Sequence, residues 1–388
     1  MIYPKFITKG STLGIPAPSA GAWDKFKKAK FVNAKKNLEK CGFNIIQSEN
    51  INTCEKYRSA DAITRANEVN KMIENKDIDA IICATGGEFL VEILPYIDFN
   101  KIVENPKWVQ GFSDPTGLLI PITTKYDIAT IYGNNYSSYG TEHMGKSAQD
   151  SLKILQGNIV EQTSYEFYEE ESLEHVTGLE DDNLTEKVEW KILNNENSEV
   201  GNNSTDSTSH MTTVEVKGRL LAGCFDLISE LAGTKYDGIP EFAEKYKDDG
   251  IIFCFDNCEI SLEEVIRILW KFNELGYFKY TKAVIFGRNG SGVNSAIYTI
   301  EECLKDSVLA NLNIPIIYDA DISHKSPCLN LINGAIATIC VSDGKAKINF
   351  ELKWKNAPFW GRGQKWDILP HFCPRPQNGA FKIQLIFP

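Results

Sequence analysis

Ile78-Asp-Ala-Ile-Ile-Cys-Ala-Thr-Gly-Gly-Glu88 is the stretch that decides the fold class of this 388-residue chain. Its first six residues are nearly all apolar, which is typical of a strand buried on both faces of a sheet. Residues 60–75 before it carry apolar side chains at helical spacing, and residues 43–46 form another short apolar run. Short buried strands that alternate with helices predict an α/β fold with a parallel sheet.

The same alternation continues on both sides of this stretch. Further strands or helices are expected at residues 11–15, 25–41, 108–110 and 128–131. In a parallel sheet, the functional residues lie on loops that leave the carboxyl ends of the strands. Two loops fit that position, Ala84–Glu88 and Gly111–Pro115.

Four regions follow from the patterns along the chain. Residues 1–160 form the N-terminal α/β domain, and residues 214–354 form a second globular domain with its own strands and helix. Residues 161–213 are acidic and then rich in Ser, Thr and Asn, which predicts a connector with a mobile loop. Residues 355–388 are rich in Pro, Phe and Trp without periodicity, and we assign no role to this tail. Two domains agree with a length that exceeds one ordinary core.

Composition narrows the partners and the compartment. Forty-one Lys and Arg against 52 Asp and Glu give a net charge of −11, which would repel nucleic acid and anionic lipid surfaces. No apolar run approaches the roughly 20 residues that span a membrane, and Pro4 and Lys5 interrupt the start too early for a signal peptide. The ten cysteines are scattered, several of them in apolar runs, which indicates buried thiols rather than disulfides or a zinc site. We therefore expect a cytoplasmic protein with no metal.

Histidine is scarce, and one of the five stands out. His324 lies in Asp321-Ile-Ser-His-Lys-Ser-Pro327, directly after an expected strand at 314–317. A loop histidine among small polar residues at a strand end suits a general base. An exposed histidine without a role remains the alternative. The others lie in less favourable contexts: His143, His175, His210 and His371.

Ser113 is the candidate nucleophile. Gly111-x-Ser113 follows a strand and precedes a helical run that opens with Pro115, a residue favoured in the first turn of a helix. A glycine two positions earlier permits a sharp strand-to-helix turn that presents the hydroxyl. The full G-x-S-x-G pattern is absent, and Gly145-Lys-Ser147 matches G-x-S equally well by chance.

Two glycine-containing loops leave alternatives open. Gly86 and Gly87 could form an oxyanion hole from backbone N–H groups, or a simple tight turn. The loop Gly287–Gly292 suggests a dinucleotide site, but its spacing is not G-x-G-x-x-G. Asp256, at the end of the expected strand 251–255, could orient a histidine or be an ordinary strand-end carboxylate.

Taken together, these segments resemble the LD-carboxypeptidase family of serine peptidases, which includes the microcin C immunity peptidases. The resemblance covers roughly residues 8–354, and its most specific block is Gly111-Phe-Ser-Asp114 with the preceding Asn105-Pro106. The other matching segments are Gly14–Ser19, Gly86-Gly87, Leu94–Asp98, Gly218–Gly223, Leu231–Tyr236, Phe286–Arg288 and the His324 loop. The long form of the Pro-Tyr-Ile-Asp block is more similar to the microcin-immunity branch.

The resemblance implies a fold, a site and an activity. The fold would be a flavodoxin-like N-terminal domain followed by a smaller mixed α/β, β-barrel-like domain, with the active site between them. Ser113 would be the nucleophile, His324 the general base and acid, and Asp256 the third member of the triad. The backbone N–H groups of Gly87 and Asp114 would form the oxyanion hole. The activity would be cofactor-free cleavage of the bond between an L-centre and a terminal D-amino acid in a murein peptide.

The resemblance also names substrate-contact positions and an assembly. Substrate contacts would come from Gly86, Glu88, Cys224 and Arg288. A homodimer with a role in peptidoglycan recycling is expected, with a small peptide or peptidyl-nucleotide as substrate. The connector is longer and more acidic than the family suggests, and in the microcin branch this region helps to cover the ligand.

Two departures from the family pattern keep other functions open. The family has Glu where Asp256 stands and usually Asn where Cys224 stands. One alternative is cleavage of peptidyl or aminoacyl adenylate analogues. A second is a non-catalytic muropeptide-binding homologue, and a third is a nucleotide-dependent enzyme that uses the Gly287 loop.

Overall fold

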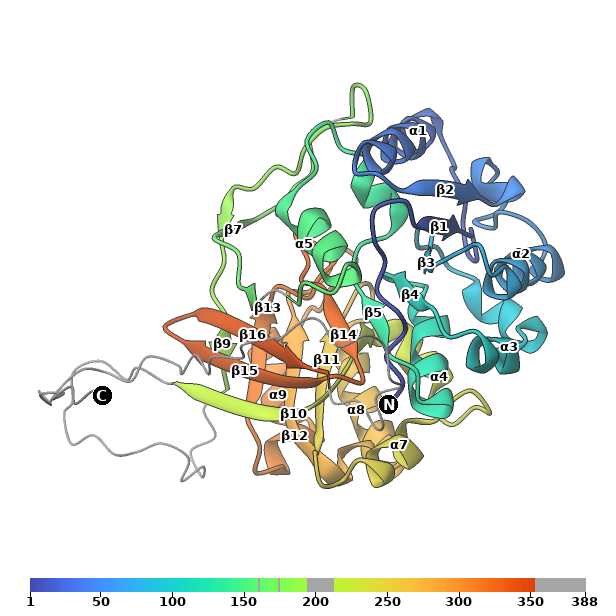
Figure 1. Ribbon diagram of the computed structural model, residues 1–388. Coiled ribbons are helices and arrows are strands. Elements are labelled where there is room, and N and C mark those ends of the chain that lie inside the picture. The colour runs from blue at the N-terminus through green and yellow to red at the C-terminus, as the bar shows by residue number, and fades with distance from the viewer. Residues whose placement is uncertain (160, 174, 194–212, 353–388) are drawn as a thin grey trace, which may run out of the picture. The chain divides into compact units, whose positions relative to one another are not determined.

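The computed structural model describes residues 1–159, 161–173, 175–193 and 213–352. Within these ranges the strands form a six-stranded sheet, an eight-stranded sheet and a two-stranded ribbon (Figure 1). The predicted tail at 355–388 and nearly all of the polar tract at 198–213 lie outside the described residues.

The first sheet is built mainly by the N-terminal half of the chain. Its strand order is β14-β5-β4-β3-β1-β2, and the five strands β1 to β5 are parallel. The strands are β1 (Thr12–Ile15), β2 (Asn44–Gln47), β3 (Ala80–Ile82), β4 (Trp108–Gly111), β5 (Thr130–Tyr132) and β14 (Leu331–Asn333). The parallel N-terminal sheet expected from the apolar runs is therefore confirmed.

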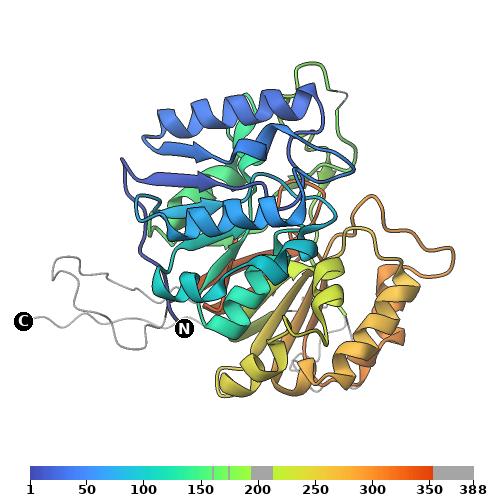
Figure 2. The same ribbon diagram turned by 90° about the vertical axis from the view of Figure 1, so that its right-hand side faces the viewer.

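Helices cover this sheet, and Figure 2 shows α1 and α2 packed along its strands. They are α1 (Lys25–Lys40), α2 (Ala62–Glu74), α3 (Phe99–Glu104), α4 (Thr116–Tyr126) and α5 (Lys146–Leu155), with 3-10 turns η1 (Glu49–Asn52), η2 (Leu90–Tyr96) and η3 (Tyr136–Gly140). Aspartates cap the start of three of these helices, because Asp24 accepts a hydrogen bond from the Lys27 N–H, Asp61 from the Thr64 N–H and Asp98 from the Asn100 N–H.

The second sheet is mixed and belongs mainly to the C-terminal half. Its strand order is β6-β16-β15-β10-β11-β12-β13-β9, with parallel pairing from β10 to β13 and antiparallel pairing on both flanks. The strands are β6 (Gln162–Thr163), β9 (Lys191–Ile192), β10 (Val214–Cys224), β11 (Ile251–Asp256), β12 (Thr281–Gly287), β13 (Ile316–Ala320), β15 (Ile336–Ser342) and β16 (Lys345–Glu351). The expected mixed α/β organisation is confirmed, in an order that ends at β6 and β9.

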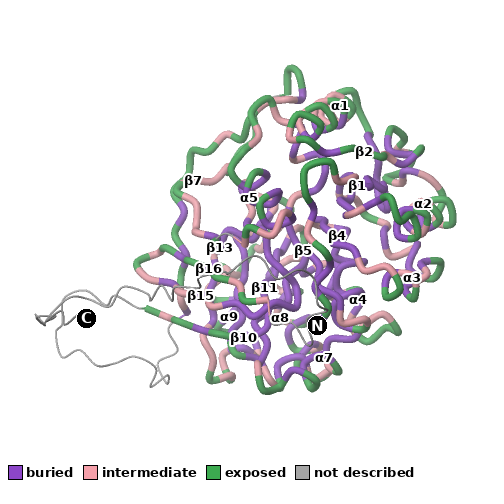
Figure 3. Tube along the Cα trace, viewed as in Figure 1, coloured by how far each residue is buried: buried purple, intermediate pink, exposed green. Residues whose placement is uncertain are grey.

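The remaining elements surround this second sheet. They are the ribbon strands β7 (Phe167–Tyr168) and β8 (Glu186–Lys187), the helices α6 (Phe225–Leu231), α7 (Ile239–Lys245), α8 (Leu262–Glu274) and α9 (Ile300–Asp306), and the 3-10 turns η4 (Tyr277–Tyr280) and η5 (Val308–Asn311). Buried residues concentrate in the strands of both sheets (Figure 3). No helix within the described ranges is long and apolar enough to cross a bilayer.

The two sheets exchange segments. β14 comes from the C-terminal half, yet it pairs antiparallel with β5 in the first sheet. On β14, the Asn333 amide donates to the Thr130 hydroxyl of β5 and to the Ala222 carbonyl of β10. The connector is also partly built into the second sheet, through β6 and β9. The described part of the connector is therefore structured rather than a free linker.

Candidate active site

Ser113 occupies the sharp turn between β4 and α4. Its φ of +69° lies in the left-handed region, which is unfavourable for a residue with a side chain and is typical of strained functional positions. The turn is closed by a 2.9 Å hydrogen bond from the Thr116 N–H to the Ser113 carbonyl. Gly111 is required two residues earlier, because a Cβ there would lie 2.4 Å from the Cβ of Pro115. The local sequence thus presents the Ser113 hydroxyl at the carboxyl end of β4.

His324 approaches that hydroxyl from the second half of the chain. It lies in the loop after β13, and its Nε2 is 2.8 Å from Ser113 Oγ. The Phe112 ring packs against the imidazole, with 4.7 Å between ring centroids. The His324 side chain keeps 20% of its surface exposed, so the imidazole can meet a ligand while its orientation is fixed.

Asp256 holds the other side of this imidazole. Its Oδ1 lies 3.0 Å from His324 Nδ1, and its Oδ2 accepts a 2.6 Å hydrogen bond from the Tyr132 hydroxyl. Burial alone would lower the pKa of His324. The charge and hydrogen bond of Asp256, together with the nearby Cys258, outweigh burial and raise the pKa of His324 well above its ordinary value. The hydrogen bonds fix the imidazole so that Nε2 can accept the Ser113 proton.

The loop that holds Gly87 borders the same hydroxyl through Gly86, and Asp114 directly follows Ser113 in the chain. Gly86 packs so closely that a Cβ there would lie 3.2 Å from Ser113 Oγ. Gly87 has φ of +152°, and a Cβ on it would come within 2.3 Å of Ser19 Oγ. Within the described residues, neither the Gly87 N–H nor the Asp114 N–H donates a hydrogen bond. Both groups are therefore available for a substrate oxygen.

The Asp114 carboxylate braces the loops around these donors. It is fully buried, and its Oδ2 accepts hydrogen bonds from the Ser19 hydroxyl and from the Leu90 N–H. Burial raises the pKa of Asp114 to about 6. One side chain therefore ties the loop after β1 to the segment that follows Gly87.

The glycine-containing segment at the end of β12 packs between the loop that carries His324 and the loop that follows Asp256. A Cβ on Gly287 would lie 1.6 Å from the Ile322 carbonyl oxygen, and one on Gly290 would lie 2.4 Å from the Cys258 carbonyl oxygen. The Gly290 N–H also donates to the Asn257 carbonyl at 2.8 Å. Close backbone packing explains these glycines without a dinucleotide.

Arg288 supports the histidine loop. It is only 6% exposed, and its Nη1 lies 2.5 Å from Asp321 Oδ1. Its guanidinium also stacks over the Tyr168 ring, 4.3 Å from the centroid. The other oxygen of Asp321 accepts from the Trp190 indole at 3.0 Å. The structure thus gives Arg288 internal partners at the base of the His324 loop, and its predicted contact with substrate stays a prediction.

The other two predicted substrate contacts lie at different depths. Cys224 is buried at the end of β10, in register with Asp256, and its Sγ lies 3.5 Å from Asp226 Oδ2. Glu88 is exposed beside Gly87, and burial, followed by the charges of Glu259 and Asp226, raises its pKa. Glu88 is therefore placed to meet a ligand, whereas the Cys224 thiol is enclosed by the protein.

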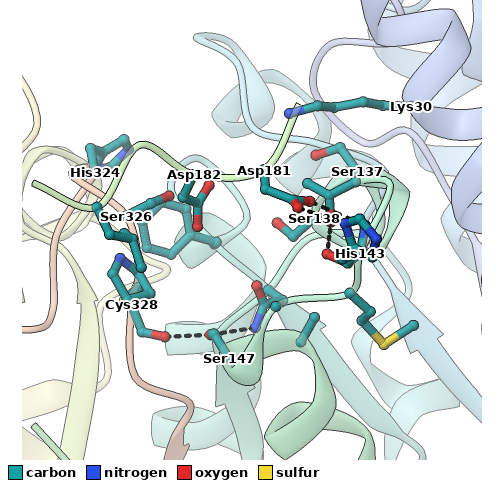
Figure 4. Close-up of a pocket in the computed structure, with 18 of the residues that line it drawn as sticks. Lys30, Ser137, Ser138, His143, Ser147, Asp181, Asp182, His324, Ser326 and Cys328 are labelled. Carbon is teal, nitrogen blue, oxygen red and sulfur yellow. Dashed lines mark hydrogen bonds and ion pairs between the residues drawn. The ribbon is translucent and has the colours of Figure 1, made fainter. Parts of the chain in front are cut away.

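A pocket of about 340 Å³ adjoins His324 and Phe112. Figure 4 shows His324 and Ser326 on one side of it and Ser137, Ser138 and His143 on the other. Part of the wall comes from the connector, namely Asp181, Asp182 and Leu184. Asp181 is held by a 2.8 Å contact with His143 Nδ1. The connector therefore contributes directly to the surroundings of the catalytic candidates.

Two residues that contribute to this site were not predicted from the sequence. Tyr132 is the last residue of β5, and a polar aromatic group at the end of a buried strand was the available signal. Asp226 accepts 3.0 Å hydrogen bonds from the N–H groups of Cys258 and Glu259, which shapes the loop after Asp256. Its position in the first turn of α6 carried no comparable signal.

A hydroxyl at a strained strand-to-helix turn, an imidazole and a buried carboxylate in one hydrogen-bonded series form the arrangement found in serine hydrolases. The model of the LD-carboxypeptidase N-terminal domain matches residues 13–133, and that of the LD-carboxypeptidase C-terminal domain matches residues 217–339. The chain belongs to the LD-carboxypeptidase family of peptidases.

Individual relatives agree with this assignment. The chain is 26% identical over 329 residues to the microcin C7 self-immunity protein MccF of Escherichia coli, covering 83% of this chain and 88% of MccF. It is 27% identical over 283 residues to a Bacillus subtilis protein named as a probable murein peptide carboxypeptidase, covering 68% and 80%. The solved structure of MccF in complex with aspartyl sulfamoyl adenosine superimposes with a TM-score of 0.71 at 23% identity, covering 91% and 99%. This structural likeness supports the fold.

Proposed function

We propose that this protein is a serine carboxypeptidase that cleaves the bond between an L-centre and a terminal D-amino acid in murein peptides. The observation that carries the proposal is the unbroken series from Asp256 through His324 to Ser113, with separations of 3.0 and 2.8 Å. Membership of the LD-carboxypeptidase family supports the bond type. The similarity to the Bacillus subtilis protein supports murein peptides as the substrate class.

In the proposed mechanism His324 acts first as a base. Its Nε2 takes the proton of Ser113 as Oγ attacks the scissile carbonyl carbon. The negative charge that develops on the carbonyl oxygen is stabilised by the N–H groups of Gly87 and Asp114. His324 then gives its proton to the leaving amine, and the D-amino acid departs. A water molecule, deprotonated by His324, hydrolyses the acyl-enzyme and regenerates Ser113.

A second candidate function is cleavage of aminoacyl or peptidyl adenylate analogues by the same residues. The observation that favours it is the similarity to MccF, which extends over most of both chains. One solved structure of MccF holds aspartyl sulfamoyl adenosine. In this case too, Ser113 would attack a carbonyl, but the leaving group would carry a nucleoside.

The test is incubation of the full chain with a murein tetrapeptide and, separately, with aspartyl sulfamoyl adenosine, followed by mass detection of products. Release of D-alanine by the wild-type chain and its loss in Ser113→Ala would support the first proposal. Cleavage of the adenosine compound alone would favour the second. Tight tetrapeptide binding without turnover of either compound would instead identify a non-catalytic binding protein.

A further inference from the structure

Lys27 has an unusual position for a lysine in the first turn of a helix. It lies near the start of α1, yet its side chain turns inward over the Trp23 ring, with Nζ 4.2 Å from the ring centroid. The same Nζ lies 3.5 Å from the Thr85 hydroxyl. The half-buried ammonium therefore lies beside the loop that follows β3.

That loop is the one that borders the nucleophile. Thr85 is buried and immediately precedes Gly86, whose backbone packs against the Ser113 side chain. The neighbouring Gly87 supplies one of the proposed oxyanion donors. Lys27 consequently brings a positive charge to the rim of the candidate active site, from the β1 side of the sheet.

This positive charge has no carboxylate partner among the described residues, since none lies within ion-pairing distance of Lys27. Burial first, and then the charge of Lys30, lower the pKa of Lys27 to about 8, and Asp24 offsets this only in part. A partly buried ammonium without a directly paired carboxylate is unfavourable in the free protein. Binding of an anion would relieve that situation.

Space for such an anion lies beside the ammonium. A cavity of about 120 Å³ is lined by Lys27 and Lys30 together with Trp23, Asp24, Phe26, His175 and Gly178. One water occupies roughly 30 Å³, so the cavity has room for a carboxylate or phosphoryl group. His175 and Gly178 belong to the connector, which forms the side of the cavity opposite α1.

Building on the proposed function, we infer that Lys27 is a specificity-determining residue whose ammonium binds an anionic group, a carboxylate or a phosphoryl group, of the substrate. A substrate that is stretched from Ser113 along the Thr85 loop would bring such a group to Nζ. A peptide with a free carboxylate and an aminoacyl nucleotide both carry this chemistry. The inference gives a role to a half-buried lysine that has the Thr85 hydroxyl and the Trp23 ring as neighbours but forms no ion pair among the described residues.

The experiment compares enzyme variants with substrates that differ by one charge. The peptide substrates are the murein tetrapeptide and forms in which one carboxylate at a time is amidated. The nucleotide substrates are an aminoacyl phosphoramidate nucleotide and its uncharged methyl ester. The variants are Lys27→Met, Lys27→Arg and, as a matched control one residue along the same helix, the exposed Lys28→Met. KM and kcat are measured for each pair, together with the melting temperature.

We expect Lys27→Met to raise KM roughly 10- to 100-fold for the fully charged substrate, the effect of losing one charged hydrogen bond. The increase should disappear for the one neutralised form that lacks the bound anion, which identifies its source. Lys27→Arg should restore part of the affinity, and Lys28→Met should leave KM unchanged. An equal rise in KM for every charged and neutralised form, or no rise at all, would overturn the inference.

Failure of the proposed function would be recognised separately. If the wild-type chain turns over none of these compounds, the catalytic proposal fails, and the same comparison is made from Kd values. A charge-dependent loss of binding in Lys27→Met would then still support the role of Lys27. No binding of any charged compound to the wild-type chain would refute it.

Discussion

The Tyr132 hydroxyl donates a 2.6 Å hydrogen bond to Oδ2 of Asp256, the carboxylate oxygen that does not face His324. Tyr132 ends β5 of the first sheet and Asp256 ends β11 of the second. Both side chains are fully buried. The Asp256 carboxylate thus contacts Tyr132 through one oxygen and His324 through the other. Residues from both halves of the chain therefore orient the imidazole.

Removal of this hydroxyl should therefore lower both the rate of catalysis and the stability of the fold. In Tyr132→Phe, one buried oxygen of Asp256 loses its donor, and we expect kcat to fall about tenfold with about 1–3 kcal/mol of lost stability. Steady-state kinetics and urea denaturation measure the two effects. Tyr139→Phe is a matched control, because Tyr139 is equally buried but bonds to Ser151 and Gln110. An equal loss of kcat in both variants would contradict the role of Tyr132.

The aspartate at position 256 should be better suited to this chain than the glutamate of the family. Asp256 already reaches both partners, and it has no exposed surface into which a longer side chain could extend. An added methylene in a packed site typically costs about 1–3 kcal/mol. We expect Asp256→Glu to lower both the melting temperature and kcat. Higher activity in this variant would show that the short side chain leaves the imidazole poorly oriented.

The pH dependence of activity should reflect the raised pKa of His324. A general base must be neutral, so kcat/KM should fall as the pH drops through this pKa, with a midpoint above the ordinary value of about 6.5. In Asp256→Asn the opposing effect of burial remains while the favourable charge is lost, so the titration of His324 should move to lower pH. NMR of the imidazole in both proteins follows this shift directly. An unchanged titration would show that Asp256 does not govern the base.

Asp114 should make stability depend on pH in the opposite sense to an ordinary paired carboxylate. Its pKa of about 6 exceeds the unfolded value of about 3.9, so ionisation is unfavourable in the folded state. The resulting loss, about 3 kcal/mol, is absent below pH 4 and complete above pH 6. The free energy of unfolding of Asp114→Asn, compared with that of the wild type, should therefore increase as the pH rises from 4.5 to 8. Urea denaturation at several pH values measures this difference.

The exposed Asp77→Asn serves as the control, because it makes the same substitution at a surface carboxylate. A stability curve for Asp114→Asn that stays parallel to that of the wild type would mean that the buried carboxylate does not change its protonation in this range.

Most strands of the fold could be predicted from the sequence, because each of them has a local apolar pattern. The apolar run at 78–83 became the fully buried strand β3, and the expected strand at 251–255 became β11. Short strands were expected between β13 and residue 354, but the pairing of β14 with the first sheet was not predicted, because no local period shows which sheet a three-residue strand joins. β6 and β9 were missed, because strands this short have no local period.

Some residues of the candidate site could also be predicted from local sequence, and others could not. Ser113 and His324 could be proposed from their loops, because each follows a recognisable strand. Tyr132 and Lys27 could not, since their roles depend on partners 124 and 58 residues away. Arg288 shows the converse, because a residue that matched a family motif has its described partners inside the protein.

The crossing of β14 into the first sheet limits how the chain can be divided into fragments. A fragment that stops before Leu331 would leave the backbone groups of β5 without the neighbour that now satisfies them, on the very strand that ends in Tyr132. The chain cannot be cut into two autonomous modules at the connector, and attempts to express the front half alone should yield an aggregation-prone species. Completion of the amino-terminal sheet must wait until synthesis has passed residue 333.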